Sequence, residues 1–156
     1  MKTPPCSRVR PATVDDLADL VELCAEHAAY EGAVYATEGK AALLRAALFS
    51  PPFRLHAWVA ELNGRVVGYA SAAAEFSTWQ AGEFLHMDCL YVRADCRGVG
   101  VGARLLRAIV DHARCTGYAE IQWQTPDWNV DAQRFYRREG AEARAKQRFS
   151  LRVSPR

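Results

Sequence analysis

The chain has 156 residues, of which 50% are hydrophobic and 24% are charged, a composition typical of one globular domain with one core. Its 20 basic and 18 acidic residues leave a formal net charge of +2, which excludes a strong general attraction to nucleic acid or to an anionic membrane. No apolar run approaches the ~20 residues of a membrane span, and the start of the chain lacks the apolar core of a secretory signal. We therefore expect a single cytoplasmic domain over residues 1–156, with residues 1–6 as a loose tail.

The N-terminal part of the chain predicts one strand followed by two helices. Residues 7–10 can form a short strand, and Thr13 is suited to cap the helix that follows. Apolar residues recur at helical spacing from there to about Tyr30. A second helix is expected over residues 39–49, and Pro51-Pro52 ends it.

Three β-rich runs come next, at residues 55–62, 66–76 and 83–92. Asn63-Gly64 separates the first two and predicts a hairpin, because both positions of such a turn need a positive φ. After a glycine-rich turn at 97–102, the expected elements are a helix at 101–115, a strand at 119–125, a helix at 130–139 and a last strand at 149–153. The order β-α-α-β-β-β-α-β-α-β predicts a mixed α/β sheet with helices on its faces.

The five cysteines are expected to be free thiols. Their number is odd, no secretory signal accompanies them, and no CxxC pair or zinc-like Cys/His spacing occurs. We therefore expect no metal site.

The glycine-rich turn is the sharpest local signal for a ligand. It reads Arg97-Gly98-Val99-Gly100-Val101-Gly102, directly after a strand and at the start of a helix. A helix start presents unpaired N–H groups to a phosphate, glycine allows close approach of a pyrophosphate, and Arg97 adds a fork of donors. Such a turn can also merely tighten a strand-to-helix connection. Neither a Walker A loop nor a Rossmann fingerprint fits its spacing.

Two motifs in the second half of the chain carry a family resemblance. Arg97, Gly100 and Gly102 follow the strand Leu90-Tyr91-Val92, and a second motif runs from Trp128-Asn129 to Gly140-Ala141. In both, the chain resembles the GNAT superfamily of acetyl-CoA-dependent N-acetyltransferases, over about residues 7–153. The resemblance implies a mostly antiparallel central sheet flanked by helices on both faces, acetyl-CoA as the acetyl donor, and a homodimer.

The resemblance also implies roles for individual residues. The backbone of Leu90, Tyr91 and Val92 would hold the pantetheine arm of acetyl-CoA, and Arg97, Gly98, Val99, Gly100, Val101 and Gly102 would hold its pyrophosphate. Asn129 would hydrogen-bond the pantetheine, and Tyr136 would protonate the departing CoA thiolate.

A closer likeness is to the diamine (spermidine/spermine) acetyltransferases and their thialysine-acetylating relatives. It covers residues 10–13 and 29–31, the region of Trp79, and residues 128–141. Those enzymes carry an acidic pair where this chain reads Asp88-Cys89. Because Cys89 replaces the second acid, the likeness favours a long polyamine less than a shorter amine.

The chemistry of acetyl transfer suggests further site residues. A lysine-like ammonium has a pKa near ~10.4 and must lose a proton before it attacks, so Asp88 is the candidate base, with Glu31 and Glu83 behind it. A backbone N–H near Leu90 or Tyr91 would stabilise the developing oxyanion. The candidates for acceptor binding are Tyr30, Glu31, Trp79, His86 and Asp88. Each also has a purely structural interpretation: a helix end, a core aromatic, a hydrogen-bonded histidine or an exposed carboxylate.

Three functions remain open at this point. The first is acetylation of a small-molecule amine, such as a diamine, an amino acid or an aminoglycoside-like compound. The second is acetylation of a protein N-terminus or lysine. The third is non-catalytic binding of acyl-CoA. Nucleic acid and membranes are not expected partners.

Overall fold

The computed structural model describes residues 7–154, which form two compact units, one ending at Gln124 and one beginning at Thr125. The loose tail expected at residues 1–6, with Cys6, lies outside the described residues. A single domain over the whole chain stays a prediction. The elements are β1 (Ser7–Pro11), α1 (Leu17–Tyr30), α2 (Lys40–Phe49), β2 (His56–Leu62), β3 (Arg65–Ser77), β4 (Gly82–Val92), α3 (Val101–Thr116), β5 (Ile121–Gln122) and α4 (Val130–Arg138).

The first unit is built on a five-stranded sheet in the order β1-β2-β3-β4-β5. The first four strands pair antiparallel with their neighbours, and β5 pairs parallel with β4. The Asn63-Gly64 turn has φ values of 53° and 79°, as a tight hairpin between β2 and β3 requires. The predicted mixed, mostly antiparallel sheet is therefore confirmed.

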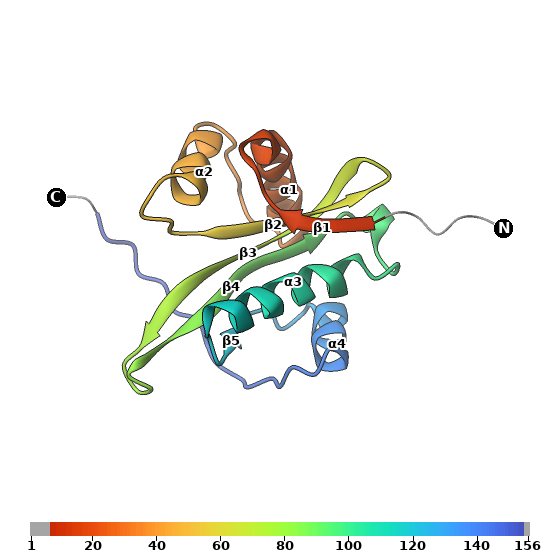
Figure 1. The fold of residues 1–156 in the computed structure, drawn as a ribbon. Coiled ribbons are helices and arrows are strands. Elements are labelled where there is room, and N and C mark those ends of the chain that lie inside the picture. The colour runs from red at the N-terminus through yellow and green to blue at the C-terminus, as the bar shows by residue number, and fades with distance from the viewer. Residues whose placement is uncertain (1–6, 155–156) are drawn as a thin grey trace. The chain divides into compact units, whose positions relative to one another are not determined.

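Helices cover both faces of this sheet, as predicted, with α1 and α2 on one side and α3 on the other (Figure 1). Two adjacent residues of β3 illustrate the division. Tyr69 packs in one cluster with Leu20 and Leu23 of α1. A Cβ at Gly68 would lie 3.3 Å from Leu105 of α3 and 2.7 Å from the carbonyl oxygen of Tyr91. Because neighbouring strand residues point to opposite faces, α1 and α3 lie on opposite sides.

Thr13 caps a short 3-10 turn, Val14–Asp16, that precedes α1, whereas Asp16 is the N-cap of α1 itself. The backbone N–H and the hydroxyl of Thr13 both donate to Asp16 Oδ2, at 2.7 Å and 3.1 Å. Arg10 on β1 donates to the same carboxylate at 2.7 Å and to Glu61 on β2 at 2.6 Å. The Arg10 guanidinium lowers the pKa of the buried Asp16 carboxyl and joins the start of α1 to the sheet.

Two predictions for the C-terminal part differ from the structure. The strand β5 comprises two residues, Ile121–Gln122, instead of the expected 119–125. The last strand predicted at 149–153 is wrong, because residues 141–154 form no helix or strand. Phe149, Leu151 and Val153 are between 84% and 89% exposed. A strand needs a hydrogen-bonding neighbour and a face to bury, and the described residues of the second unit supply only the helix α4.

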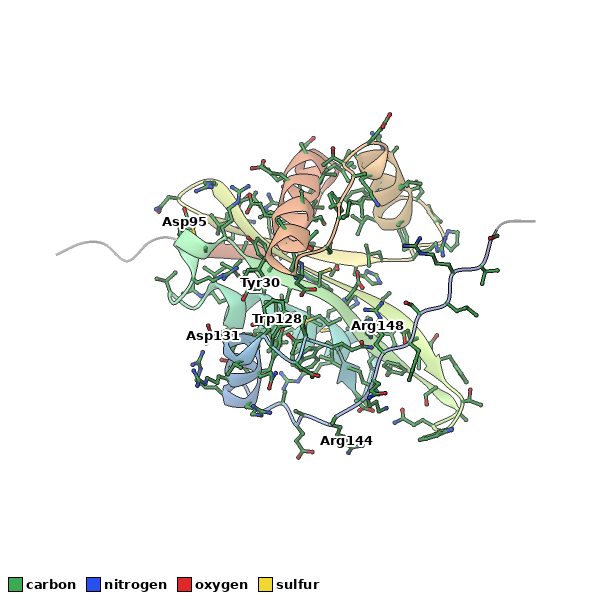
Figure 2. The ribbon with its side chains drawn as sticks, turned by 180° about the vertical axis from the view of Figure 1, so that it is seen from behind. Tyr30, Asp95, Trp128, Asp131, Arg144 and Arg148 are labelled. Atoms are coloured by element: carbon green, nitrogen blue, oxygen red, sulfur yellow. The ribbon has the colours of Figure 1, made fainter. Side chains whose placement is uncertain are left out.

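Figure 2 marks this C-terminal segment by Arg144 and Arg148, which follow α4. Within residues 7–154, no helix combines the length and the apolar character that crossing a membrane requires.

Candidate active site

A β-bulge in β4 places Asp88 at the centre of the candidate site. Ser71 of β3 pairs with Cys89, whereas the next residue, Ala72, pairs with Met87, so Asp88 is the extra residue of the bulge. The Cys89 thiol donates to Asp88 Oδ2 at 3.6 Å, so the two side chains lie on the same side of the sheet. Cys89 packs against the core cluster beneath α1. The bulge therefore presents the exposed Asp88 carboxylate on the face that carries α1.

The other edge of β4 is open beyond this bulge. Among the described residues, β5 pairs with β4 at Leu85 and His86 only. Further along, the N–H of Arg93 donates to Val67 on β3, whereas the carbonyl of Val92 accepts from Arg97 Nε at 2.8 Å. The backbone N–H and C=O of Val92 thus point away from β3. Strand residues two apart have the same orientation, so the N–H and C=O of Leu90 also point toward the open edge.

The glycine-rich turn follows β4 and leads into α3. Gly98 and Gly100 have φ values of +77° and +83°, in the left-handed region that favours glycine, and no atom lies within 4 Å of a Cβ built on either. The hydrogen bond from Arg104 N to Gly100 O is the first of the helix. The preceding N–H groups have no partner within the helix, an arrangement suited to an anion.

The side chain of Arg97 lies against two tyrosine rings. Its guanidinium carbon is 4.8 Å from the ring centre of Tyr30 and 5.4 Å from that of Tyr91. Tyr30 is the last residue of α1, and its side chain is labelled at the end of that helix in Figure 2. The structure therefore brings Arg97 together with the end of α1, a contact that the sequence analysis missed and for which the sequence carries no signal.

A buried polar cluster lies beneath the end of α1. The Tyr69 hydroxyl lies 3.0 Å from His27 Nδ1, and His27 Nε2 lies 3.3 Å from the Glu31 carboxylate. The Tyr69 hydroxyl is also within hydrogen-bonding reach of Cys89, whose pKa is raised to about 12, first by burial and then by the Asp88 charge. Cys89 is thus a neutral thiol, and Asp88 supplies the negative charge of the pair.

The structure does not bring Trp79 together with Asp88. Trp79 lies in the turn between β3 and β4 and is 99% exposed, so it is not a core residue either. Asp88 comes six positions after Gly82 along the strand, roughly 20 Å at ~3.3 Å per residue. His86 is closer, two residues before the bulge, where its Nδ1 lies 3.9 Å from the Glu75 carboxylate.

Asn129 and Tyr136 belong to the second unit. Asn129 caps α4, because its Oδ1 accepts a hydrogen bond from Ala132 N at 3.2 Å. This capping role is not among the sequence predictions, although asparagine before a helix is a common capping signal. Tyr136 is half-buried on α4, and its ring centre lies 5.1 Å from that of Phe135.

A cavity of about 280 Å³ occupies another part of the first unit. Its walls come from β1, α2, β2 and α3, including Phe49, Trp58 and His112, and none of the predicted site residues lines it. We therefore do not assign this cavity to the candidate site.

Comparison with known proteins shows the family to which the chain belongs. Residues 17–141 match the acetyltransferase (GNAT) family, so the chain belongs to that family and is an N-acetyltransferase. The thialysine N-epsilon-acetyltransferase of Bos taurus is 28% identical over 142 residues, which cover 86% of this chain and 83% of that protein. An L-ornithine N5-acetyltransferase of Arabidopsis thaliana is 30% identical over 83 residues, covering 53% of this chain and 36% of that protein.

The fold is also that of solved acetyltransferase structures. An aminoglycoside N-acetyltransferase in complex with CoA superposes with a TM-score of 0.80 over 99% of both chains, at 16% sequence identity. At this identity the likeness concerns the fold alone.

Proposed function

We propose that the chain transfers the acetyl group of acetyl-CoA to a primary amine of a small molecule, by direct attack within a ternary complex. The observation that carries the proposal is the β4 bulge. It sets the exposed carboxylate of Asp88 two residues from the peptide groups of Leu90 at the open strand edge. An amine and an extended acyl donor could therefore meet at one point of the sheet. The names of the relatives, which act on thialysine and ornithine, support a small amine as acceptor.

The open edge and the glycine-rich turn fit the two ends of acetyl-CoA. Leu90, Tyr91 and Val92 would hold the pantetheine arm, with the outward peptide groups of Leu90 as the hydrogen-bonding pair. The open space around Gly98 and Gly100 leaves room for a pyrophosphate at the first N–H groups of α3. The family resemblance adds Val99, Val101 and Gly102 to this turn and assigns Asn129 to the pantetheine.

The chain's own groups would supply the proton transfers. The Asp88 carboxylate would take the proton from the bound ammonium, directly or through a water, so that the amine nitrogen can form a bond to the acetyl carbon. The N–H of Leu90 would stabilise the negative charge that develops on the acetyl oxygen. Tyr136 would donate its phenolic proton to the departing sulfur. A phenol at about pKa 10 loses that proton to a thiolate of about pKa 8.5 at modest cost.

The acceptor would bind between the end of α1 and the bulge. Tyr30, Glu31 and His86 would line this position together with Asp88, and the distant Trp79 has no part in it. Because Cys89 is a neutral thiol, the bulge carries one negative charge, which suits one ammonium group better than a long polycation. An amino acid, a short diamine or an aminoglycoside-like amine is therefore the proposed acceptor class. A cytoplasmic location and a homodimer stay predictions.

The test is release of CoA from acetyl-CoA in the presence of a panel of amines: putrescine, spermidine, lysine, thialysine, ornithine, aminoglycosides and short peptides. We expect release with a small amine, and a large loss of kcat in Tyr136→Phe. A blank without amine corrects for the protein's own thiols. Release with peptides alone would identify a protein acetyltransferase. A rise in melting temperature with acetyl-CoA, without release, would identify a non-catalytic binding module.

A further inference from the structure

The guanidinium group of Arg97 contacts the open edge of β4 and two tyrosine rings on the α1 side of the sheet. Arg97 Nε donates to the carbonyl of Val92 at 2.8 Å. The guanidinium carbon lies over the rings of Tyr30 and Tyr91. A cation over two aromatic faces is held by attraction to both rings. The side chain thus turns from the glycine-rich turn toward the end of α1.

The same side of α1, from Glu22 to Tyr30, is anchored to the end of β4 and to the residues that follow it. Glu22, Glu26 and Tyr30 are spaced four residues apart and therefore form one row along the helix. Arg93, whose side chain is 8% exposed, contacts Glu22 at 2.8 Å and Glu26 at 3.1 Å. The Tyr91 hydroxyl reaches Glu26 at 3.5 Å. Arg97 makes the last contact of this row, at Tyr30.

We infer that Arg97 is a positioning residue for the acceptor amine, which holds the ring of Tyr30 beside the acceptor position, and that it is not a ligand of the pyrophosphate. The inference rests on the proposed function. Moving the guanidinium to a phosphate would break the hydrogen bond to Val92 and both ring contacts. The N–H groups at the start of α3 can bind the pyrophosphate without it. Tyr30 is 41% exposed at a helix end, and the loss of Arg97 would remove the cation that lies over its ring.

The test compares Arg97→Gln with the wild-type protein in two measurements: the dissociation constant of acetyl-CoA, measured directly by calorimetry, and the KM of the amine. We expect the amine KM to rise about 3- to 30-fold, the range that loss of such a cation–π contact produces. The acetyl-CoA dissociation constant should change by less than about twofold. Arg107→Gln is the matched control. It removes the same charge from the exposed side of α3 and should change neither value.

Arg97→Lys separates the two roles further. Lysine keeps the positive charge, which a phosphate contact needs, but loses the planar group and the Nε–H that the present contacts need. We expect Arg97→Lys to raise the amine KM almost as much as Arg97→Gln does. Tyr30→Ala should also raise the amine KM, and adding Arg97→Gln to it should change that KM by less than about twofold, because both act through the same ring. Thermal unfolding of each variant checks that it folds.

Three results would overturn the inference. One is an acetyl-CoA dissociation constant that rises tenfold or more in Arg97→Gln while the amine KM stays unchanged. Another is full rescue by Arg97→Lys, and the third is an additive effect of Tyr30→Ala and Arg97→Gln. The proposed function fails in a different way, because the wild-type protein itself would then release no CoA with any amine.

Discussion

The hydroxyl of Tyr69 on β3 lies 3.0 Å from Nδ1 of His27 on α1, next to the thiol of Cys89 and beneath the bulge that carries Asp88. This buried contact joins the helix that carries Tyr30 to the strands that carry the proposed base. Because the other nitrogen of His27 reaches Glu31, the two contacts together orient its ring.

Tyr69→Phe removes this hydroxyl and leaves His27 Nδ1 without its partner. We expect the variant to lose about 1–3 kcal/mol of unfolding free energy, because a buried polar atom would be left unsatisfied. Urea unfolding followed by circular dichroism measures the loss. Tyr118→Phe, which removes the same group from the segment after α3, is the control and should cost less than about 0.5 kcal/mol. Equal stabilities of the two variants would contradict the structural role of Tyr69.

Asp16→Asn tests the ion pair with Arg10. Arg10 lowers the pKa of Asp16 below its ordinary value of 3.8, so the pair adds stability above that value and loses it as the pH falls through the lower, folded-state pKa. We expect the variant to cost about 1–3 kcal/mol at pH 7. The difference from wild type should shrink steadily below about pH 4.

The measurement is urea unfolding at several pH values between 7 and 2. Asp15→Asn, at the exposed neighbouring position, is the control and should change stability little at any pH. A stability difference for Asp16→Asn that is independent of pH would rule out the ionised pair as its cause.

Gly100→Ala tests the phosphate-binding role of the glycine-rich turn. Gly100 has a φ of +83° and precedes α3, and Gly39 has a φ of +72° and precedes α2, so alanine meets similar backbone strain at each. We expect each substitution to cost about 1–2 kcal/mol of stability. Only Gly100→Ala should weaken acetyl-CoA binding, by about tenfold or more in calorimetry. Equal acetyl-CoA affinities in the two variants would move the phosphate site away from this turn.

Asp88→Asn tests the proposed base. We expect kcat/KM for the amine to fall by about 10²–10⁴ at pH 7, the range that loss of a general base produces. Glu83→Gln, on the same strand and also exposed, should keep most of the activity, because it lies outside the bulge. A larger loss in Glu83→Gln than in Asp88→Asn would reassign the base. Direct measurement of acetyl-CoA binding separates a loss of chemistry from a loss of the donor.

The sequence by itself determined the elements whose limits depend on local chemistry. The hairpin at Asn63-Gly64 agrees with prediction, because it depends on positive φ at both residues. The helix predicted at 101–115 ends at Thr116, where Gly117 follows with a φ of 87°. The cap at Thr13 also depends only on residues close to it in the chain. The strand predicted at 149–153 failed for the opposite reason, since alternating apolar residues form a strand only where another strand pairs with them.

The tertiary structure decided where the candidate site residues lie. The bulge at Asp88 depends on the register in which β4 pairs with β3, and it sets which face the carboxylate occupies. The turn of Arg97 toward Tyr30 likewise depends on the packing of α1 against the end of β4. The motif predicted Arg97 as a site residue. The direction of its side chain, however, is set by rings of other elements, because contacts between separate segments form only when the chain folds.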